Sequence, residues 1–580
     1  MRRRTLLAGA PLAALAACAQ VPISGPVVPV APASSREVEQ GIGIEVQPPV
    51  RGGSPEVILA GFLLAMSSDR PGYPVARQYL TQSASNDWKP ESGAVIYESD
   101  NHKPVTTEES AALNAPWVGS LDAEGRHTPH SGTYKHDFRM IKVDGQWRIG
   151  SPPEGLLLAR YLFQRYFRPV TLYFLTGNGQ TVAPELVHLP EATVNPSAAL
   201  EGLLAGPAPW KRPSVGTAIP ADTRSTLASV SVDGGVAEVS LTDPIAGLGD
   251  RQRLQVAAQL MWTMNQFSQV TAVRITVNGQ PWALPGEPSG TVRLVDVTSF
   301  APIDSRSLGT VVGARESVLG HVDERIGGRF SPVQGAWGQP DWGDTVGGLA
   351  VSRDETRVAV VSQDRKRLWT GDVSGVPHMV HEGAALANPQ VTDDGSWTID
   401  SSGTGASKLV HVGRNGEVQV VDIPDLPDGR VVAFRLAPDL TRMAVVLAQG
   451  DQSSLGMVRL RDREGRLQPE GWRELPLHAS QGLLTAMRDV AWAEAMELLV
   501  VAAGSADPHF SVYRVRSDAS RVEAMGPSDL EIEITQISAL PRVSGTTAVV
   551  VTEDQTVWRL EDRFRWQEVA GDLPVAALPG

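Results

Sequence analysis

Hydrophobic residues recur at two different spacings along this chain. Between residues 54 and 66, and again between residues 251 and 267, apolar side chains return every three or four positions, which is the spacing of one helix face. Beyond residue 300, short runs rich in β-branched residues alternate with polar turns. The chain is therefore predicted to start its folded part with mixed helix and strand and to end in an all-β region.

Residues 54–160 are predicted to form a small α+β domain. Ser54-Pro55-Glu56 has the composition of a helix N-terminus, with serine as the N-cap and proline at the first helical position. A second short helix is expected at residues 76–80. Asp144-Gly145 is expected to form the turn of a β-hairpin, because both residue types tolerate positive φ.

Residues 169–285 form the next predicted unit. A strand at Leu172-Tyr173-Phe174 is followed by a helix that Asn195-Pro196 caps and Gly206-Pro207 ends. A hairpin turning at Asp233-Gly234-Gly235, a long helix and a closing strand complete it. The predicted order is β–α–ββ–α–β, one sheet covered by two helices.

Several separated motifs of this unit resemble the GerMN domain of spore germination and cell-envelope proteins. The motifs are Leu172-Tyr173-Phe174, residues 199–207, Ala218-Ile219-Pro220, Val236-Ala237-Glu238-Val239 and residues 273–279. The resemblance implies binding within the cell envelope and no chemistry of its own.

After residue 300 a pattern repeats in which a β-rich run ends in a turn with an aspartate. Asp354, Asp394 and Asp439 occupy equivalent positions, at steps of 40 and 45 residues. Periods of this length with four short strands are typical of propeller blades. Five blades are predicted within residues 300–580, and residues 300–340 supply either a further blade or the strand that closes the ring.

The first residues have the pattern of an export signal. Three arginines precede an apolar stretch too short to span a bilayer, and small residues lead to Cys18, the only cysteine of the chain. Leu15-Ala16-Ala17-Cys18 resembles the lipobox of bacterial lipoproteins. The resemblance implies removal of residues 1–17 and conversion of Cys18 to an N-palmitoyl and S-diacylglycerol cysteine. Arg3-Arg4 also resembles a twin-arginine signal, so both the Sec and the Tat routes stay open.

Residues 18–53 are rich in proline and are predicted to be an extended tether. With Cys18 assigned to the anchor, no cysteine remains for a disulfide, and the domains must be stabilised by core burial alone. Net charge is −14, and without the three signal arginines 48 basic residues face 65 acidic ones, a net charge of −17. Phosphate backbones and anionic headgroups repel such a surface. Nucleic acid is excluded as a partner, and the lipid is expected to provide the membrane attachment.

Two histidine groups invite a metal interpretation. His127-x-x-His130 with His136, and His378-x-x-His381, place imidazoles three residues apart. Neither group has the glutamate of a zinc protease helix, and both stretches are rich in loop-forming residues. We interpret these histidines as solvated loop residues and predict no metal and no cofactor.

The repeated aspartates and several tryptophans have two possible roles each. Asp393-Asp394, Asp354 and Asp439 could bind Ca²⁺, but an EF-hand spacing is absent, and capping of tight turns between blade strands is the favoured interpretation. Tryptophans could anchor a partner or pack between blades, and packing is favoured. These tryptophans are Trp337, Trp342, Trp472 and Trp566.

Catalysis is not supported by any sequence motif. The chain has no Gly-x-Ser-x-Gly elbow, phosphate loop or dinucleotide fingerprint. The protein is therefore predicted not to be an enzyme. A propeller hydrolase or lyase would instead require carboxylates or histidines clustered at the central mouth.

Taken together, the expected fold class is multidomain: a small α+β N-terminal domain, an α+β GerMN domain and an all-β C-terminal propeller. In this order, after a lipobox and a tether, these parts resemble the LpqB lipoprotein family of actinobacteria. The resemblance implies an accessory protein anchored to the cell membrane on its extracytoplasmic face. It would bind the extracytoplasmic domain of the sensor kinase MtrB and modulate MtrA–MtrB two-component signalling in cell-wall homeostasis and division. The alternative is a peptidoglycan- or muropeptide-binding protein that acts through the GerMN domain and the propeller.

Overall fold

The structure is a computed structural model that describes residues 46–580 except 69, 101, 103, 108–109, 304–308, 402–405, 527–532, 543–544 and 563. Cys18, the predicted signal peptide and most of the predicted tether lie outside the described residues. The last tether residues touch the folded part, since Tyr79 Oη donates to the Gln47 carbonyl at 2.8 Å and Gly52 N donates to Gln146 Oε1 at 2.7 Å.

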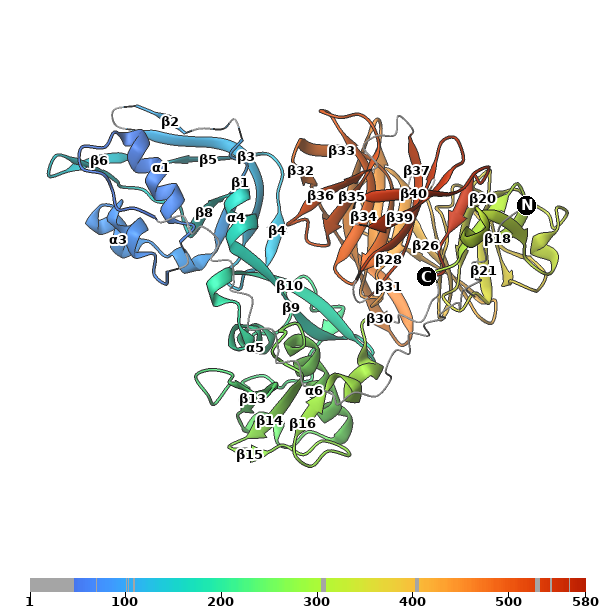
Figure 1. The fold of residues 1–580 in the computed structure, drawn as a ribbon, viewed down its shortest axis with the longest axis horizontal. Helices are drawn as coiled ribbons and strands as arrows, with labels where there is room; N and C mark the ends of the chain where they lie inside the picture. The colour runs from blue at the N-terminus through green and yellow to red at the C-terminus, as the bar shows by residue number, and fades with distance from the viewer. Residues whose placement is uncertain are drawn as a thin grey trace, which may run out of the picture. The chain divides into compact units, whose positions relative to one another are not determined.

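The N-terminal domain combines short helices with a mixed sheet and a separate hairpin (Figure 1). Its strands pair in the order β2-β3-β1-β8, with β4 and β5 also on β3, and β6 pairs with β7. The helices are α1 (Pro55–Ala65), α2 (Pro74–Gln78), α3 (Gln82–Asp87), η1 (Pro90–Ser92) and α4 (Arg160–Tyr166). The strands are β1 (Ala94–Tyr97), β2 (Val105–Thr106), β3 (Ala111–Leu121), β4 (His127–Pro129), β5 (Thr133–Asp137), β6 (Met140–Val143), β7 (Gln146–Ile149) and β8 (Leu156–Ala159).

Local sequence explains the first helix and the hairpin, and both predictions are confirmed. Ser54 is the N-cap of α1, where its Oγ accepts from Val57 N. The buried face of α1 brings Phe62 against Trp88, with ring centroids 5.7 Å apart. Asp144 and Gly145 join β6 to β7 with φ of 50° and 74°, as a two-residue turn that matches strand twist requires. The second helix starts earlier than predicted, at a proline that fixes φ for its first turn.

The middle domain contains two sheets that share one core. The first sheet has the order β10-β9-β11, and the second has the order β12-β13-β14-β15 with β16 on β14. Its strands are β9 (Phe167–Thr176), β10 (Val182–Pro190), β11 (Val215–Gly216), β12 (Val232–Asp233), β13 (Val236–Leu241), β14 (Ala272–Val277), β15 (Gln280–Pro281) and β16 (Thr291–Arg293). Its helices are η2 (Glu191–Thr193), α5 (Pro196–Leu204), η3 (Asp243–Ile245), α6 (Asp250–Met264) and η4 (Leu294–Phe300).

The predicted single sheet is wrong, although both helices and the closing strand are confirmed. Strand β10 was not predicted, because residues 182–188 are all buried and lack the alternation of a half-exposed strand. Prolines at 184 and 190 further hide the strand, since proline lacks a backbone donor. Helix α6 instead serves as the crossover between the parallel strands β13 and β14, and its buried side chains join the core of both sheets.

The C-terminal region forms a ring of β-sheets, the blades of a propeller (Figure 1). Blade 1 contains β17 (Val311–Arg315), β18 (Val318–Asp323), β19 (Arg329–Pro332) and β41 (Val575–Ala577). Blade 2 contains β20 (Val346–Val351), β21 (Arg357–Ser362), β22 (Arg367–Asp372) and β23 (His378–Glu382). Blade 3 contains β24 (Gln390–Thr392), β25 (Gly395–Asp400), β26 (Lys408–Gly413) and β27 (Val418–Asp422).

The remaining blades continue the same order from the centre outward. Blade 4 contains β28 (Arg430–Leu436), β29 (Arg442–Gln449), β30 (Gln452–Arg463) and β31 (Arg466–Glu474). Blade 5 contains β32 (His478–Ala479), β33 (Gly482–Glu494), β34 (Glu497–Gly504), β35 (Ser511–Arg516) and β36 (Val522–Gly526). Blade 6 contains β37 (Ile534–Leu540), β38 (Thr547–Thr552), β39 (Val557–Asp562) and β40 (Arg565–Ala570). A short 3₁₀ turn at Glu324–Ile326 joins β18 to β19 within blade 1, and another at Ala336–Gly338 lies in the connection from blade 1 to blade 2.

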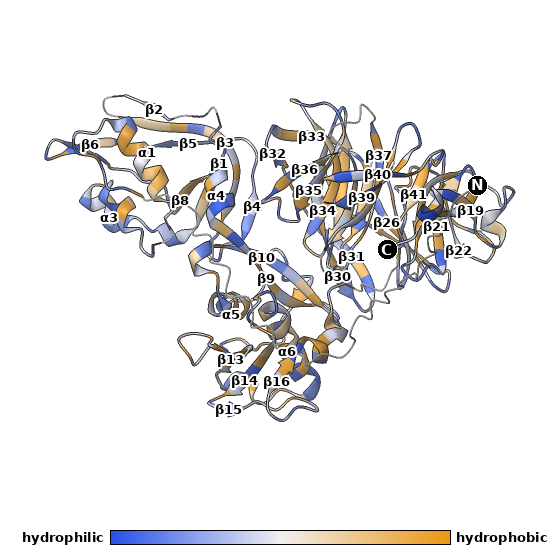
Figure 2. Ribbon diagram, in the orientation of Figure 1, coloured by the Kyte–Doolittle hydropathy of each residue, from blue (hydrophilic) through white to orange (hydrophobic). Residues whose placement is uncertain are grey.

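The described residues thus form six blades: the five predicted and the further blade that residues 300–340 were expected either to supply or to replace with a closing strand. The closing strand is β41 instead. Residues 300–340 supply the three outer strands of blade 1, and the C-terminal strand β41 supplies its innermost strand. Ala576 pairs with Gly313, and Gly580 N donates to the Val351 carbonyl of blade 2 at 3.1 Å. The strands carry most of the hydrophobic positions of the propeller, and the turns between them are largely hydrophilic (Figure 2). The hydrophobic cores accordingly lie between neighbouring blades.

Candidate functional site

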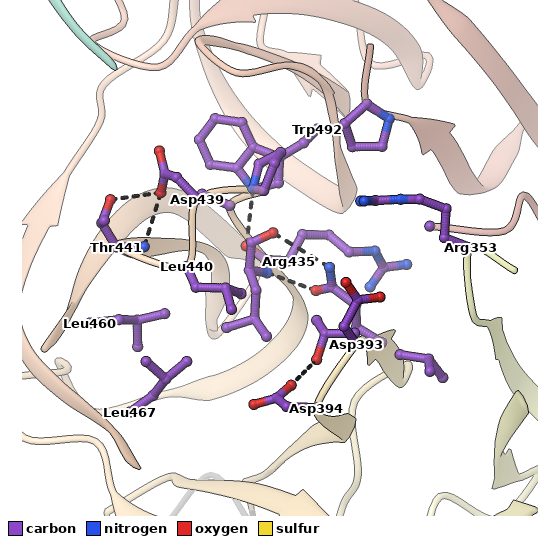
Figure 3. A pocket seen from close by; sticks show the side chains of 18 of the residues that line it. Arg353, Asp393, Asp394, Arg435, Asp439, Leu440, Thr441, Leu460, Leu467 and Trp492 are labelled. Carbon is purple, nitrogen blue, oxygen red and sulfur yellow. Dashed lines mark hydrogen bonds between the residues drawn. The ribbon is translucent and has the colours of Figure 1, made fainter. Parts of the chain in front are cut away.

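A cavity of about 470 Å³ lies at the end of the propeller where the innermost strands turn into the second strands. Residues of β20, β24, β28, β33, β37 and β41 line it, together with the β9–β10 loop of the middle domain. We call this cavity the mouth (Figure 3). Its volume lies within the range of small-molecule and short-peptide sites.

The turns around the mouth are built on the repeated aspartates. Asp354 Oδ1 accepts from Ser352 Oγ at 2.6 Å and from Thr356 Oγ1 at 2.8 Å, and these hydrogen bonds lower the pKa of Asp354 below its usual value. Asp439 Oδ1 accepts from Thr441 N at 2.9 Å and from Thr441 Oγ1 at 2.7 Å. The prediction that these aspartates cap turns is confirmed, because their carboxylates are occupied by their own loops.

The residue before each turn aspartate faces the mouth. Arg353 precedes Asp354 and Asp393 precedes Asp394, and both Arg353 and Asp393 line the cavity (Figure 3). In blade 4 the same position is Pro438. The aspartate turns of blades 2, 3 and 4 therefore present an arginine, an aspartate and a proline at the mouth, so the repeat alone does not specify the chemistry of the cavity.

Arg435 on β28 is a second guanidinium at the mouth (Figure 3). Its Nη1 donates to the Phe434 carbonyl at 2.7 Å, and no carboxylate of the described residues forms an ion pair with it. Asp489, on β33, accepts from Ile537 N at 2.9 Å. Burial raises the pKa of Asp489 above its usual value, and the charge of Arg435 opposes that rise. Arg435 therefore keeps several N–H groups available to a ligand in the mouth.

Part of the lining of the mouth is apolar. Trp492 is buried and its Nε1 donates to the Arg435 carbonyl at 3.1 Å, which fixes the indole beside that arginine. Leu440, Leu460 and Leu467 complete this apolar wall. Leu440 has a φ of 54°, in the left-handed region that leucine rarely adopts. Four aspartates also line the mouth: Asp393, Asp394, Asp439 and Asp462. Asp394, Asp439 and Asp462 accept hydrogen bonds from their own loops. The mouth thus combines guanidinium groups, carboxylates and an aliphatic surface, a lining that can bind a ligand of mixed polarity.

A second cavity, of about 230 Å³, lies where the N-terminal domain, the middle domain and the propeller meet. Asp518, in the turn after β35, contacts both other domains. Its Oδ2 lies 2.7 Å from His188 Nε2 of β10, and its carbonyl accepts from His127 Nδ1 of β4 at 2.8 Å. We call this three-domain contact the joint.

Burial controls the charges at the joint. Burial alone would raise the pKa of Asp518, but the charge and hydrogen bond of His188 outweigh it and hold that pKa well below its usual value. Burial lowers the pKa of His127 to about 4, so this imidazole is neutral at pH 7. Its Nε2 faces Gly119, where a Cβ would lie 2.2 Å from that nitrogen. The joint is therefore closely packed around the contact of His188 with Asp518 and one neutral histidine.

Further polar contacts fill the rest of the joint. Arg126 Nε donates to Glu185 Oε1 at 2.9 Å, and Arg126 Nη2 donates to the Gly206 carbonyl at 2.9 Å. Ala208 N donates to the Glu185 carboxylate at 3.1 Å. Burial lowers the pKa of Lys211 to about 8, and the charge of Glu185 opposes that shift. Arg126 and Glu185 are paired with each other and with backbone groups, and Lys211 donates to the Pro184 carbonyl, so we assign the joint a structural role.

Two further contacts attach the propeller to the other domains. Trp210 of the middle domain lies between the guanidinium carbons of Arg459 and Arg473, at 5.5 and 5.0 Å from its ring centroid. Arg160 of the N-terminal domain donates to the His478 carbonyl at 2.8 Å. The three domains are therefore held together by hydrogen-bonded and cation–π contacts as well as by apolar packing.

The structure corrects the interpretation of the first histidine group. His127 is 5% exposed and not solvated, because it lies on strand β4 at the joint and not in a loop. The His130 ring stacks on Trp117 at 3.8 Å, and His136 Nε2 lies 2.9 Å from the Ser151 carbonyl. Among the residues that the structure describes, no three His, Cys, Asp or Glu side chains are grouped as metal ligands.

The second histidine group and the tryptophans are also placed by the structure. His378 and His381 lie on β23, the outermost strand of blade 2, and not in the predicted loop. Trp337 donates to the Asp372 carbonyl at 3.1 Å, and Trp566 donates to the Met525 carbonyl at 3.0 Å. Packing of the tryptophans is confirmed, since the members of the set contact the blade cores: Trp337, Trp342, Trp472 and Trp566.

The predicted anchor, Cys18, lies outside the described residues, and its lipidation stays a prediction. Among the described helices, none combines the length and the apolar composition that crossing a bilayer requires.

Sequence reasoning missed the residues that define the mouth and the joint. Arg435 had a usable signal, because it is a charged residue inside an otherwise apolar inner strand. Asp518 had none, since its partner His188 is 330 positions away in the chain. Arg126 and Glu185 likewise meet only through tertiary structure.

Comparison with known proteins identifies three regions. Residues 48–164 match the family model described as the lipoprotein LpqB N-terminal domain. Residues 171–282 match the model for sporulation and spore germination, which is named Germane. Residues 320–579 match the model described as the lipoprotein LpqB beta-propeller domain.

Full-length relatives and solved structures are also similar to the chain. A protein of Cutibacterium acnes named lipoprotein LpqB is 33% identical over 592 aligned residues, which cover all of this chain and 99% of the relative. A Streptomyces coelicolor protein of the same name is 28% identical, with 97% of this chain and 95% of the relative covered. The first GerMN domain of the sporulation protein GerM from Bacillus subtilis is 22% identical, with a TM-score of 0.17, over 21% of this chain and 92% of that chain.

A nidogen/laminin complex structure aligns with 46% of this chain and 97% of its own matched chain, at 11% identity and a TM-score of 0.33. The full-length sequence match, with the N-terminal, GerMN and β-propeller regions each recognised in the same order, shows that this chain belongs to the LpqB lipoprotein family.

Proposed function

We propose that this protein is a lipid-anchored extracytoplasmic accessory protein that binds the sensor kinase MtrB and modulates MtrA–MtrB signalling in cell-wall homeostasis and division. The observation that carries the proposal is membership of the LpqB lipoprotein family over the whole chain. The lipobox ending at Cys18 supports attachment to the membrane in which such a kinase resides.

Physical reasoning supports a role that needs no chemistry. Anchoring confines the protein to the surface that holds its target, and this raises the effective concentration, so that a weak interface is still occupied. Modulation then requires only that the protein binds one state of the kinase more tightly than the other, by about 1–3 kcal/mol.

The joint supports this role in a second way. Asp518, His188 and His127 connect the three domains through buried contacts. A partner that binds one domain therefore meets a surface whose orientation the other two domains help to fix, which lowers the entropy lost on binding.

Binding to the kinase can be tested with the full chain. The variant Cys18→Ser, which lacks the acylated residue, should still co-purify with the extracytoplasmic domain of MtrB in solution, with lower occupancy than the anchored protein shows in a bilayer. Absence of a complex when the anchored protein and full-length kinase share a reconstituted bilayer would contradict the proposal. Retention of the full chain on purified cell wall without any kinase would favour the peptidoglycan-binding alternative.

A further inference from the structure

We propose that the mouth of the propeller binds the C-terminal end of a short peptide, with Arg435 holding the terminal carboxylate and the leucine wall holding an aliphatic side chain. The test of this site does not involve the kinase, so its outcome is independent of the kinase binding proposed above. The proposal rests on the cations, the Asp393 carboxylate and the apolar wall that the cavity brings together.

The cationic side of the mouth fits a carboxylate. The Arg435 guanidinium uses Nη1 for the Phe434 carbonyl and forms no ion pair with a described carboxylate, although it is only partly exposed. Guanidinium groups bind carboxylates through two parallel hydrogen bonds, in a fixed geometry. Arg353 of blade 2 lines the same cavity and adds positive potential (Figure 3). A carboxylate ligand would therefore accept hydrogen bonds from guanidinium N–H groups of Arg435 that the described residues leave available.

The carboxylate of Asp393 explains why a peptide fits better than a simple anion. The Asp393 side chain is exposed at the mouth, and no described residue donates a hydrogen bond to it (Figure 3). Its charge opposes the binding of any anion, a peptide carboxylate included, but a peptide also brings N–H groups or an ammonium group from which Asp393 can accept hydrogen bonds, whereas sulfate does not. Asp394 beside it is occupied, because Thr392 Oγ1 donates to it.

The leucine wall supplies the third part of the argument. Leu440 holds a left-handed backbone conformation at a turn position where glycine or asparagine would be unstrained. The next residue, Thr441, donates two hydrogen bonds to the preceding residue, Asp439, and these bonds hold the turn at Leu440. Glu355 has the same backbone conformation after Asp354, so the turn sets the left-handed φ and Leu440 is the side chain that blade 4 places there, at the cavity wall. With Leu460, Leu467 and Trp492 it forms a surface suited to an aliphatic group.

The experiment uses the full chain and the tripeptide Ala-Ala-Leu, measured by isothermal titration calorimetry. The free-acid peptide should bind, and the same peptide with a C-terminal amide should bind at least tenfold more weakly, because the charge-assisted hydrogen bonds to Arg435 are lost. Inorganic phosphate should not compete with the peptide, because Asp393 repels it.

Three variants locate the site. Arg435→Gln should weaken binding of the free acid at least tenfold and abolish the preference over the amide. Leu440→Gly should weaken binding of both peptides, and its fold should persist, because glycine adopts this φ without strain. Arg565→Gln, a change on the outermost strand of blade 6, is the matched control and should leave binding unchanged.

Four results would overturn the proposal: no heat of binding with the wild-type chain, equal affinity for acid and amide, unchanged binding by Arg435→Gln, or competition by phosphate at the peptide's own concentration. Circular dichroism of each variant establishes that it is folded. If Arg435→Gln is unfolded, the acid–amide comparison on the wild-type chain and the Leu440→Gly result still decide the question.

Discussion

Asn195 at the start of α5 is a residue whose role can be read directly from hydrogen bonds. Its Oδ1 accepts from Ser197 N at 2.9 Å and from Ala198 N at 3.0 Å, donors that the helix itself cannot satisfy. Asn195→Ala should lower the free energy of unfolding by about 1 kcal/mol, and Asn195→Asp should lower it much less. Urea unfolding measures both, and equal effects of the two variants would contradict the capping role.

His127 gives the protein a specific dependence on pH. Its pKa is about 4 in the folded chain and 6.5 when unfolded, so between these values only the unfolded chain binds the proton. The stability that the neutral imidazole contributes is present above pH 6.5 and is lost as pH falls from 6.5 to 4, on the order of 3 kcal/mol in total.

The variant His127→Asn isolates this effect, because asparagine can donate to the Asp518 carbonyl but does not titrate. The wild-type chain should be the more stable of the two at pH 7, and its advantage should shrink as the pH is lowered to 4.5. Urea midpoints at several pH values measure the difference. A difference that stays constant over this range would mean that the folded-state pKa of His127 is not depressed.

At the scale of single residues, sequence reasoning succeeded where the partner is near in the chain. Ser54, Asn195 and Asp354 interact with backbone or side chains within three positions, and their roles as caps were predicted. His127 was assigned wrongly, because its burial depends on a propeller turn 391 positions away. Local patterns cannot reveal a contact of that kind.

Asp518 shows how one turn connects three domains. Asp518→Ala would remove the carboxylate that lies 2.7 Å from His188, whose side chain is 1% exposed, and would leave a buried imidazole without its acceptor. The loss should be about 3–5 kcal/mol of stability at the joint. Hydrogen exchange should become faster in β4 and β10 in this variant, while the outer strands of blade 2 keep their protection.

A matched variant tests whether the charge matters. Asp518→Asn keeps the shape and an acceptor oxygen, so it should restore part of the protection lost in Asp518→Ala. Exchange rates at the joint that are the same in wild type and Asp518→Ala would show that apolar packing alone holds the domains.

Strand β41 is the element on which closure of the ring depends. Deletion of residues 574–580 would remove the buried side chains of Val575, Ala577 and Leu578 and expose the edge of β17. At about 1.5–3 kcal/mol for each large side chain and less for alanine, the loss approaches the whole stability of a domain. The truncated chain should lose cooperative unfolding of the propeller, measured by near-ultraviolet circular dichroism. Removal of Gly580 alone, which costs one hydrogen bond, is the control.

At the scale of elements, the repeated turns made five blades predictable, and the sixth stayed an open alternative. Blade 1 is split between residues 311–332 and 575–577, so no single stretch of sequence carries its complete pattern. Strand β10 was missed because burial on both faces removes the alternation that identifies a strand.

For the whole molecule, the order of domains was predictable and the two cavities were not. The order of the domains could be predicted because the composition and motifs of each domain lie within one continuous segment of the chain. The mouth requires six innermost strands to converge, and Arg435, Asp393 and Leu440 meet there from two blades. Only the folded propeller brings these lining residues together, so the chemistry of the site could not be predicted from the sequence.

Because the last strand of the chain completes blade 1, this blade cannot form until synthesis of the chain is finished. β17 emerges early and waits for β41, which is encoded more than 200 residues later. At about 5–20 residues per second of synthesis, this delay amounts to tens of seconds. Throughout that interval the edge of β17 that β41 later covers is open and could pair with a wrong strand. A chaperone or a translocation machine that shields this edge would raise the yield of functional protein.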